Sequence, residues 1–388
     1  MNKKTMRQGL KVTALAAFSA VLIGQGFGAG LGTFPTSRAY AAEASAIPQP
    51  AGSLSVKSYG AVGNGKTDSL KAFQKTIQAA KKQGKTVYVP AGNYALSDRL
   101  ALDGVKLSGA GSEKTILTST NPESGSIDLR GKNSSLKNLA HVYQTTGTRD
   151  GSDSKNSVTV LGASNFVIQN VRIVGAGTAG ILVRDGASDG VISGNVVKST
   201  KADGIHITGG SKRITVANNV VKKTGDDTIA VVSYLKDSAA VSQVSIRGNS
   251  VGYGAKARGI SVVGGNGIAI DKNTINNTEM AGIYIAVESN WGTRDVKNVT
   301  VSGNTVIGTG TREDGDHPNV LVFADSGSID EVSFTGNTIS NSANAGVGVW
   351  GNGNIGDIYF TSNQVKNSAN NATIFKSGEI HSQSNSGF

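Results

Sequence analysis

The chain has 388 residues, of which 52 are glycine, 6 are proline and none is cysteine. Without cysteine the fold has no disulfides, and abundant glycine with little proline is typical of a protein with many tight turns. The formal net charge is +11. The chain has no dense lysine and arginine run interleaved with aromatic residues, which argues against a nucleic-acid-binding protein.

Residues 1–41 are predicted to be an export signal. An apolar stretch over residues 12–24 follows a basic start, and Ala39-Tyr40-Ala41 offers a small-residue cleavage site. The apolar stretch is too short for a membrane span, so we expect no stable membrane insertion. Five basic and no acidic residues lie in this region, which leaves +6 for the mature chain. We therefore predict a secreted, extracellular protein.

Residues 42–52 are predicted to be a linker, and residues 53–110 a cap that differs from the rest of the chain. Within the cap, apolar residues fall on one helical face, with Thr67 or Asp68 placed to cap the start and Gly84 the end. The apolar positions are Leu70, Phe73, Ile77 and Ala80. A helix laid across the end of a stack of strands protects the unpaired strand edge.

A two-part motif recurs about eight times over residues 111–388. Its first part is an asparagine that opens the pattern Asn-x-Val/Ile, and successive asparagines lie 24 to 33 residues apart. The asparagines are Asn170, Asn195, Asn219, Asn249, Asn273, Asn304, Asn337 and Asn363. Its second part is a Gly-Ile-x-Val sequence, as in "GILV" from Gly180 and "GIHI" from Gly204. A repeat of this length indicates stacked coils.

Each coil is expected to hold two or three short strands, because the apolar runs are short, β-branched and alternating, and have no helical period. One coil cannot bury its apolar face alone, whereas parallel stacking aligns isoleucine over isoleucine in a continuous core. The predicted fold is therefore all-β, a right-handed parallel β-helix. We interpret the repeated asparagine as a turn residue with a left-handed backbone whose stacked side chains form a structural ladder.

Charged residues gather at one register position of these coils. The residue before the Gly-Ile-x-Val motif, or its equivalent, is Asp203, Asp227 and Arg258 in three successive coils, and Asp226 precedes Asp227. Because stacked strands lie about 4.8 Å apart, we expect the three carboxylates and the guanidinium to form one cluster. Two carboxylates with divergent pKa values are what glycosidic hydrolysis requires, one as acid and one to activate water.

The segment "VKSYGAVGNGKTDSLKAFQKTIQAA", followed by "GKTVYVPAGNY" and "VKLSGAGSEKTIL", resembles the N-terminal cap of the pectate-lyase-like superfamily. "ADGIHI" at Ala202 and "GDDTIAV" at Gly225 resemble the two acidic motifs of polygalacturonase-type glycoside hydrolases. This resemblance implies an inverting hydrolase that needs no metal or other cofactor, with Asp226 as general acid and with Asp203 and Asp227 holding the attacking water.

Two departures from that family bear on the substrate. The family's His-Gly motif falls on Arg258-Gly259, and its Arg-x-Lys pair falls on Tyr284 and Ala286. The basic pair that binds the sugar carboxylate is thus missing at its usual place. The expected partner is a polysaccharide, and whether it is acidic stays open.

Other reactions and roles fit the same cluster. The resemblance also extends to Ca²⁺-dependent polysaccharide lyases, in which Arg258 would be the base and the three aspartates the calcium ligands. In uronate epimerases on this scaffold an Asp/His pair acts, and Asp203 with His206 is a faint match. A surface β-helix that binds carbohydrate without cleaving it is the non-enzymatic alternative, and carboxylates buried in turns or capped by backbone amides would argue against a glycosidase.

Three further residues are predicted to contact the substrate. His206 should point outward from the same sheet, and Tyr284 and Trp291, one coil on, could stack on sugar rings.

An inserted loop, "REDGDHP" over residues 312–318, carries donor types suited to a metal, but without a diagnostic ligand spacing. A glycosidase should hold the catalytic carboxylates about 5 to 10 Å apart in an open groove.

Overall fold

Three columns of parallel strands run along the molecule. The computed structural model describes residues 45–388, which form one compact unit. The predicted export signal and the start of the predicted linker lie outside the described residues. No helix in the described part of the chain is long and apolar enough to cross a membrane.

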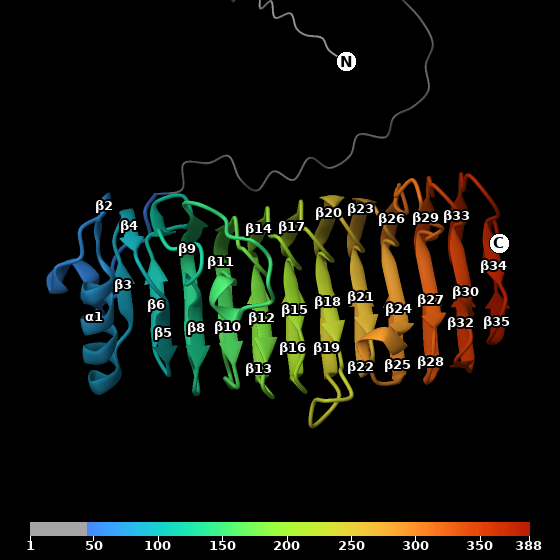
Figure 1. Cartoon of the computed structure of the whole chain (residues 1–388), viewed down its shortest axis with the longest axis horizontal. Coiled ribbons are helices and arrows are strands. Elements are labelled where there is room, and N and C mark those ends of the chain that lie inside the picture. The colour runs from blue at the N-terminus through green and yellow to red at the C-terminus, as the bar shows by residue number, and fades with distance from the viewer. Residues whose placement is uncertain (1–44) are drawn as a thin grey trace, which may run out of the picture. The chain divides into compact units, whose positions relative to one another are not determined.

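The first column is an 11-stranded sheet, which faces the viewer in Figure 1. Its strands are β5 (Leu100–Asp103), β8 (Ile127–Arg130), β10 (Val158–Leu161), β12 (Ile181–Arg184), β15 (Ile205–Ile207), β18 (Ile229–Val232), β21 (Ile260–Val263), β24 (Ile283–Val287), β27 (Val320–Ala324), β30 (Val347–Gly351) and β34 (Thr373–Phe375).

The other two columns belong to one 24-stranded sheet, in which two long strands, β9 (Ser135–Tyr143) and β11 (Val167–Val174), contribute to both. The second column contains β1 (Leu54–Ser55), β3 (Val87–Val89), β6 (Lys106–Gly109), β13 (Ser188–Ser193), β16 (Lys212–Ala217), β19 (Ser242–Arg247), β22 (Gly265–Asp271), β25 (Val296–Ser302), β28 (Ser328–Thr335), β31 (Asn354–Ile355), β32 (Asp357–Thr361) and β35 (Glu379–Gln383). The third contains β2 (Asn64–Asp68), β4 (Gly92–Leu96), β7 (Thr115–Ser119), β14 (Val196–Lys198), β17 (Val220–Lys222), β20 (Ser250–Ala255), β23 (Thr274–Thr278), β26 (Thr305–Ile307), β29 (Thr338–Ser340) and β33 (Gln364–Lys366).

The core follows from the register of these strands. Ile205 pairs with Ile229, Ile229 with Ile260 and Ile260 with Ile283, and all four side chains are fully buried. Burying each such side chain contributes about 1.5 to 3 kcal/mol. The alignment of isoleucine over isoleucine confirms the predicted parallel β-helix.

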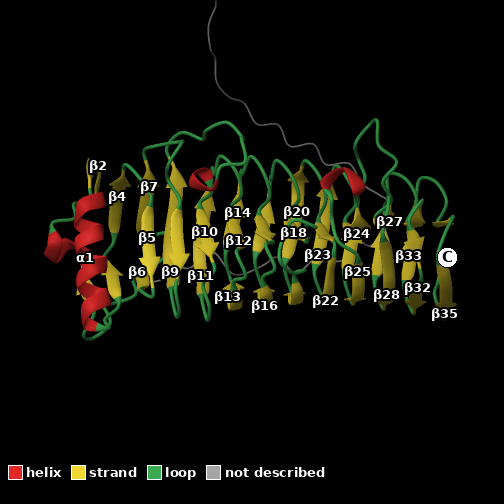
Figure 2. Cartoon of the chain, turned by 60° about the horizontal axis from the view of Figure 1, so that its bottom comes forward, coloured by secondary structure: helices red, strands yellow, loops and turns green. Residues whose placement is uncertain are grey.

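The α-helix α1 (Leu70–Gln83) lies at the end of the stack opposite the C-terminus in both cartoon views (Figures 1 and 2). Its predicted apolar face is buried, and Gly84 ends it with a left-handed φ of 62°. The N-cap residue is Ser69, next to the predicted Thr67 or Asp68, and its side chain makes no capping bond, although Asp68 Oδ1 accepts a hydrogen bond from the Leu70 N–H at 3.1 Å. Three 3-10 helices complete the secondary structure of the described residues, η1 (Val56–Tyr59), η2 (Asp153–Lys155) and η3 (Ser289–Trp291).

The asparagine ladder exists, but our interpretation of it was partly wrong. In each coil from Asn195 onward the asparagine is buried, and its Nδ2 donates to the Oδ1 of the next ladder asparagine at 2.8 to 3.0 Å. The left-handed residue is the one before it, such as Gly194 or Asn218. Asn170 has φ 54° and is exposed, so it occupies that preceding position and does not belong to the ladder. The turn thus needs both a left-handed residue and a buried amide, at adjacent positions.

Candidate active site

The predicted charged residues lie two positions before three neighbouring strands of the 11-stranded sheet. Asp203 precedes β15, Asp227 precedes β18 and Arg258 precedes β21. Because these strands pair in register, the three residues stack on one edge of the sheet, with Asp226 beside them. The structure therefore brings together the four residues that we predicted as a cluster.

The three carboxylates share one small region. One oxygen atom from each of Asp203, Asp226 and Asp227 lies within 4.8 Å of the other two, just below the expected range of about 5 to 10 Å. Asp203 Oδ1 accepts the backbone N–H of Asp227 at 3.1 Å, and Asp227 Oδ1 accepts that of Arg258 at 2.8 Å. Asp203 and Asp227 thus have the amide caps that favour a structural role. Asp226, with 28% of its side chain exposed, opens to solvent.

Each carboxylate also faces a cationic group. The closest atoms are Arg149 Nη2 and Asp226 Oδ2 at 2.6 Å, His206 Nδ1 and Asp203 Oδ2 at 2.6 Å, and Arg258 Nη1 and Asp227 Oδ1 at 3.8 Å. Ser261 adds a hydrogen bond to Asp227 Oδ2 at 2.6 Å. The negative charges of the cluster are therefore balanced from within the protein.

Burial and charge shift two protonation equilibria here. Burial raises the pKa of Asp227 to about 6, with Arg258 lowering it and the neighbouring carboxylates of Asp203 and Asp226 raising it. Burial lowers the pKa of His206, but the carboxylates of Asp203, Asp227 and Asp226 together outweigh this effect, so the net pKa is raised. His206 Nε2 is buried without a hydrogen-bond partner among the described residues. The cluster can thus hold a proton near neutral pH.

Tyr284 does not lie where we expected it. Its side chain is only 2% exposed, and its ring lies under the Arg258 guanidinium, 4.4 Å from ring centroid to Cζ. Its hydroxyl donates to Glu288 Oε1 at 3.0 Å, and Glu288 also pairs with Arg258 Nη2 at 3.1 Å. The prediction that Tyr284 stacks on a sugar ring is therefore wrong. Its outward position on β24 is covered, and it positions Arg258.

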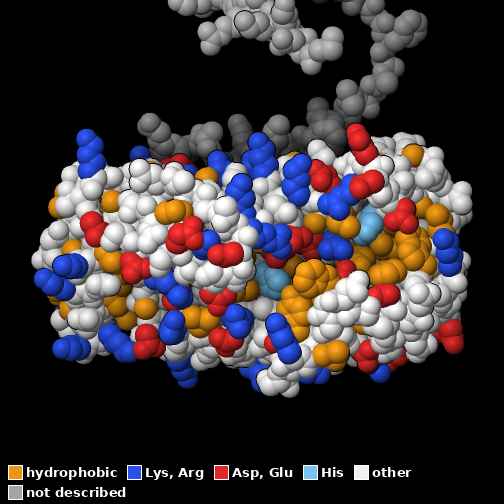
Figure 3. All heavy atoms as spheres, viewed as in Figure 1, with side chains coloured by type: hydrophobic (Ala, Val, Ile, Leu, Met, Phe, Trp, Pro, Cys, Tyr) orange, Lys and Arg blue, Asp and Glu red, His pale blue; other side chains and the backbone are white. Residues whose placement is uncertain are grey.

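The cluster opens into a groove of about 220 Å³ that includes two predicted substrate contacts, His206 and Trp291. Trp291 is 70% exposed. On the face seen in Figure 3, acidic and basic side chains gather over the middle of the unit beside hydrophobic side chains. The full lining is Arg149, Asp203, His206, Asp226, Asp227, Ala230, Val232, Tyr234, Arg258, Val263, Glu288, Trp291 and Thr293.

Sequence reasoning missed seven of the thirteen residues that line this groove, among them Arg149, Tyr234 and Glu288. Arg149 lies in the loop between β9 and η2, 77 residues from its partner Asp226. No local pattern marks it, because loop residues follow no register. Glu288 directly follows β24, so registering the residues at strand ends, as well as those at strand starts, could have found it.

The acidic loop over residues 312–318 does not assemble a metal site. Its His317 turns inward, with its ring 5.7 Å from that of Tyr284, and Nδ1 accepts the Ala281 N–H at 3.4 Å. Burial, together with the nearby Arg258, lowers the pKa of His317 to about 4. Within residues 45–388 the loop forms no group of three closely spaced metal-ligand side chains.

The calcium ion that the lyase alternative requires fits the cluster poorly. Three carboxylates within 4.8 Å are suitable oxygen donors for Ca²⁺. However, each faces a cationic partner, namely His206, Arg149 or Arg258. A calcium ion would have to displace at least one of these groups, so we derive no chemical step through a metal.

Part of the chain is similar in sequence to phage appendage proteins. The chain is 30% identical to the pre-neck appendage protein of Bacillus phage B103 over 121 residues, 31% of this chain and 14% of that protein. The chain thus spans only a small part of the length of the curated relatives it matches.

Among solved structures, the catalytic unit of the GH87 alpha-1,3-glucanase of Streptomyces thermodiastaticus has TM-score 0.64 and 23% identity, covering 88% of this chain and 70% of that one. The mannuronan C-5 epimerase AlgE4 A-module of Azotobacter vinelandii has TM-score 0.62 and 22% identity, covering 84% and 98%. At these identities the likeness shows the fold.

Residues 234–365 also match the right-handed β-helix region, which confirms the predicted handedness. Because residues 53–284 match the family described as rhamnogalacturonase A/epimerase, pectate lyase-like, the chain belongs to that family.

Proposed function

We propose that this protein is a secreted enzyme that cleaves polysaccharides as an inverting glycoside hydrolase. One observation carries the proposal: three carboxylates with oxygens within 4.8 Å of one another line a groove beside an exposed tryptophan. The family and the two solved structures above are consistent with carbohydrate chemistry, since their descriptions name a rhamnogalacturonase, a glucanase and epimerases.

In the proposed reaction Asp226 delivers a proton to the glycosidic oxygen, because it is the carboxylate that opens to the groove. Burial raises the pKa of Asp227 to about 6, so above that pH this carboxylate is ionised and can accept the proton of the attacking water. Substrate entry displaces Arg149 from Asp226. As the bond from the sugar carbon to the protonated glycosidic oxygen breaks, a water molecule held by Asp203 and Asp227 attacks that carbon and gives its proton to Asp227. Trp291 supplies a flat apolar surface for a sugar ring.

The short carboxylate spacing raises the question of stereochemistry. Carboxyl groups about 5 to 5.5 Å apart are typical of retaining enzymes, and wider spacings of inverting ones. Here every oxygen of Asp203 and Asp227 already accepts a hydrogen bond, from Asp227, His206, Arg258 or Ser261. Such fixed carboxylates are better suited to orienting water than to attacking a sugar, so we propose inversion. Proton NMR of the first anomer released checks this assignment.

The Asp203–His206 pair favours a second candidate, an epimerase or lyase. A histidine whose Nδ1 is oriented by a carboxylate and whose Nε2 lacks a protein partner has the arrangement of a general acid or base. However, the raised pKa of His206 favours the imidazolium, which cannot abstract a proton. We therefore rank this candidate second. A groove that binds sugar without cleaving it is the third.

The decisive experiment compares wild-type protein with Asp226→Asn on acidic and neutral polysaccharides, with and without a calcium chelator. Asp357→Asn, at a half-buried aspartate on the second column that pairs with His381, is the control outside the groove. We expect new reducing ends, no absorbance from unsaturated products and no effect of the chelator. The Asp226 variant should lose activity by at least about a hundredfold.

Other outcomes would move the assignment. Unsaturated products that disappear with the chelator would indicate a lyase. A changed ratio of sugar epimers without chain cleavage would indicate an epimerase. Binding without any reaction would indicate a carbohydrate-binding protein.

A further inference from the structure

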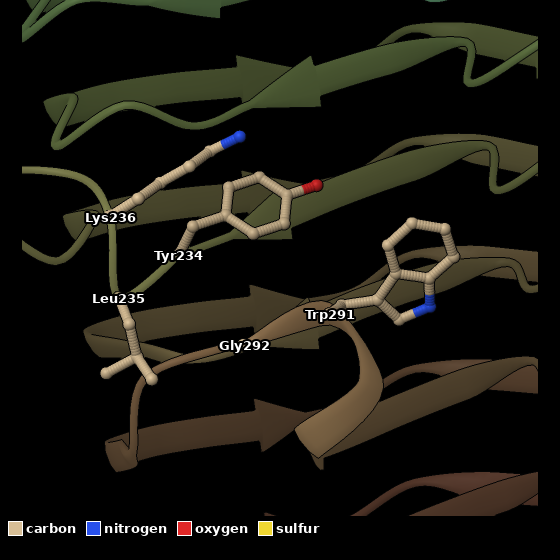
Figure 4. Close-up of a pocket in the computed structure, with 5 residues that line it drawn as sticks. All are labelled: Tyr234, Leu235, Lys236, Trp291 and Gly292. Atoms are coloured by element: carbon tan, nitrogen blue, oxygen red, sulfur yellow. The ribbon is translucent and has the colours of Figure 1, made fainter.

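A second hollow adjoins the acidic groove. Its volume is about 370 Å³, and its lining residues are Tyr234, Leu235, Lys236, Trp291 and Gly292 (Figure 4). Tyr234 and Trp291 also line the acidic groove, so the two hollows lie side by side and share these two residues. None of the catalytic roles described above involves Lys236, Leu235 or Gly292.

The two loops that form this hollow are tied together. Tyr234 and Thr293 form an antiparallel bridge, and the Leu235 N–H donates to the Gly292 carbonyl at 2.7 Å. The Arg294 guanidinium donates to the carbonyl oxygens of Tyr234 at 3.0 Å and of Leu235 at 3.3 Å. Backbone groups that bond to each other across the loops fix the relative positions of the side chains. The hollow is therefore built in advance of any ligand.

The chemistry of the hollow suits a sugar ring. Figure 4 shows the rings of Tyr234 and Trp291 arising from two different segments of the chain, with Lys236 extended beside Tyr234. The Lys236 ammonium lies 5.0 Å from the centroid of the Tyr234 ring. Within residues 45–388 Lys236 forms no ion pair. Aromatic faces can stack on the apolar face of a sugar, and a free ammonium can donate hydrogen bonds to its oxygen atoms.

We propose that this second hollow is a subsite that binds further sugar units of the polysaccharide cleaved at the acidic groove. The inference rests on the proposed function, because it takes the substrate to be a chain of sugars. Trp291, exposed at the junction of the two hollows, guides the chain from one into the other. Tyr234 stacks on a unit beyond the cleaved bond, and Lys236 donates to it.

Binding is measured by calorimetry on the Asp226→Asn protein, so that no turnover is needed. The probes are α-1,3-linked glucose oligosaccharides and α-1,4-linked galacturonate oligosaccharides, each from disaccharide to octasaccharide. We expect the affinity for one series to rise in a step at the length that first reaches the second hollow. The two series distinguish a neutral from an acidic sugar as the group that Lys236 contacts.

Two added substitutions test the hollow itself. Lys236→Ala should weaken binding of the longer oligosaccharides by about tenfold, the effect of losing one hydrogen bond from a charged donor. Gly292→Asn adds a side chain to the lining. Its Cβ meets no atom within 4 Å, and asparagine tolerates the left-handed φ of 59°. Both should leave the affinity for the shortest oligosaccharides unchanged. Lys366→Ala, an exposed lysine on β33, is the matched control and should have no effect.

Equal affinities of the parent and both variants at every length, or no binding of either series, would overturn the proposal. Its failure can be told apart from failure of the proposed function. If wild-type protein cleaves a polysaccharide but the length step is absent, the subsite is wrong and the hydrolase stands. If the step is present but no polysaccharide is cleaved, the subsite stands and the hydrolase is wrong.

Discussion

Replacing one ladder asparagine should lower the free energy of unfolding far more than the small size of the asparagine side chain suggests. Asn249 is 1% exposed, and its side chain takes part in four hydrogen bonds. Its Oδ1 accepts from the backbone N–H and the Nδ2 of Asn219, both at 2.9 Å. Its Nδ2 donates to the Val216 carbonyl at 3.0 Å and to Asn273 Oδ1 at 2.9 Å.

In Asn249→Ala the backbone N–H of Asn219 loses its ladder partner inside the core. An unsatisfied buried donor costs about 1 to 3 kcal/mol, and three further lost hydrogen bonds cost about 0.5 to 1.5 kcal/mol each. We therefore expect the free energy of unfolding to fall by about 2.5 to 7.5 kcal/mol. Because each coil contacts only its neighbours, the coils that contain Asn219 and Asn273 should lose stability as well.

Guanidinium unfolding followed by circular dichroism measures the loss, and amide hydrogen exchange locates it. The matched control is Asn170→Gly, because Asn170 is exposed, has a left-handed backbone and makes one side-chain hydrogen bond, to Asn138 at 3.2 Å. Its cost should stay below about 1 kcal/mol. Equal losses in the two variants, or a loss below about 1 kcal/mol in Asn249→Ala, would refute the account of the ladder.

Three further predictions concern the candidate active site. Because the folded protein raises the pKa of Asp227 from 3.8 to about 6, its contribution to stability is complete below about pH 4 and is lost as the pH rises through 6. The free energy of unfolding of the wild type, measured relative to that of Asp227→Asn, should thus fall by up to about 3 kcal/mol between pH 4 and pH 7. A difference between the two proteins that does not change with pH would contradict this prediction. Ser261→Ala removes a hydrogen bond to the ionised Asp227, so the pKa of Asp227 should rise further, which NMR titration of the carboxyl group detects. Tyr284→Phe keeps the ring under Arg258 and loses one hydrogen bond, so the free energy of unfolding should fall by about 1 kcal/mol, as measured by thermal unfolding. The affinity for oligosaccharides should not change. Weaker binding would show that Tyr284 contacts the substrate after all.

The fold could be predicted in advance because its determinants are local and repeated. The Gly-Ile-x-Val motif recurs in the strands of the 11-stranded sheet, and the alternation within each strand fixes which side chains point inward. The same register placed Asp203, Asp227 and Arg258 in one stack. Because stacked strands are regularly spaced, residues at the same position of successive coils lie close together in space, and a pattern found in one coil applies to every coil.

The positions of the asparagines and of Tyr284 could not be read correctly in the same way. A shift of one residue separates the left-handed turn position, which Asn170 occupies, from the buried ladder position of Asn195. Asparagine suits both positions, so residue type alone does not distinguish them. Tyr284 points outward from its strand as alternation requires, yet it is buried. Alternation gives the direction of a side chain and says nothing of what covers it.

The sequence by itself determined the coil, the stacking register and the acidic cluster, because each depends on a backbone geometry that repeats. Only the tertiary structure decided which groups surround that cluster. Arg149 and Trp291 reach it from a loop and a short 3-10 helix outside the repeat, and the second hollow depends on hydrogen bonds between two such segments. Loops of unequal length follow no period, so their positions are set by the contacts they make and not by a pattern along the chain.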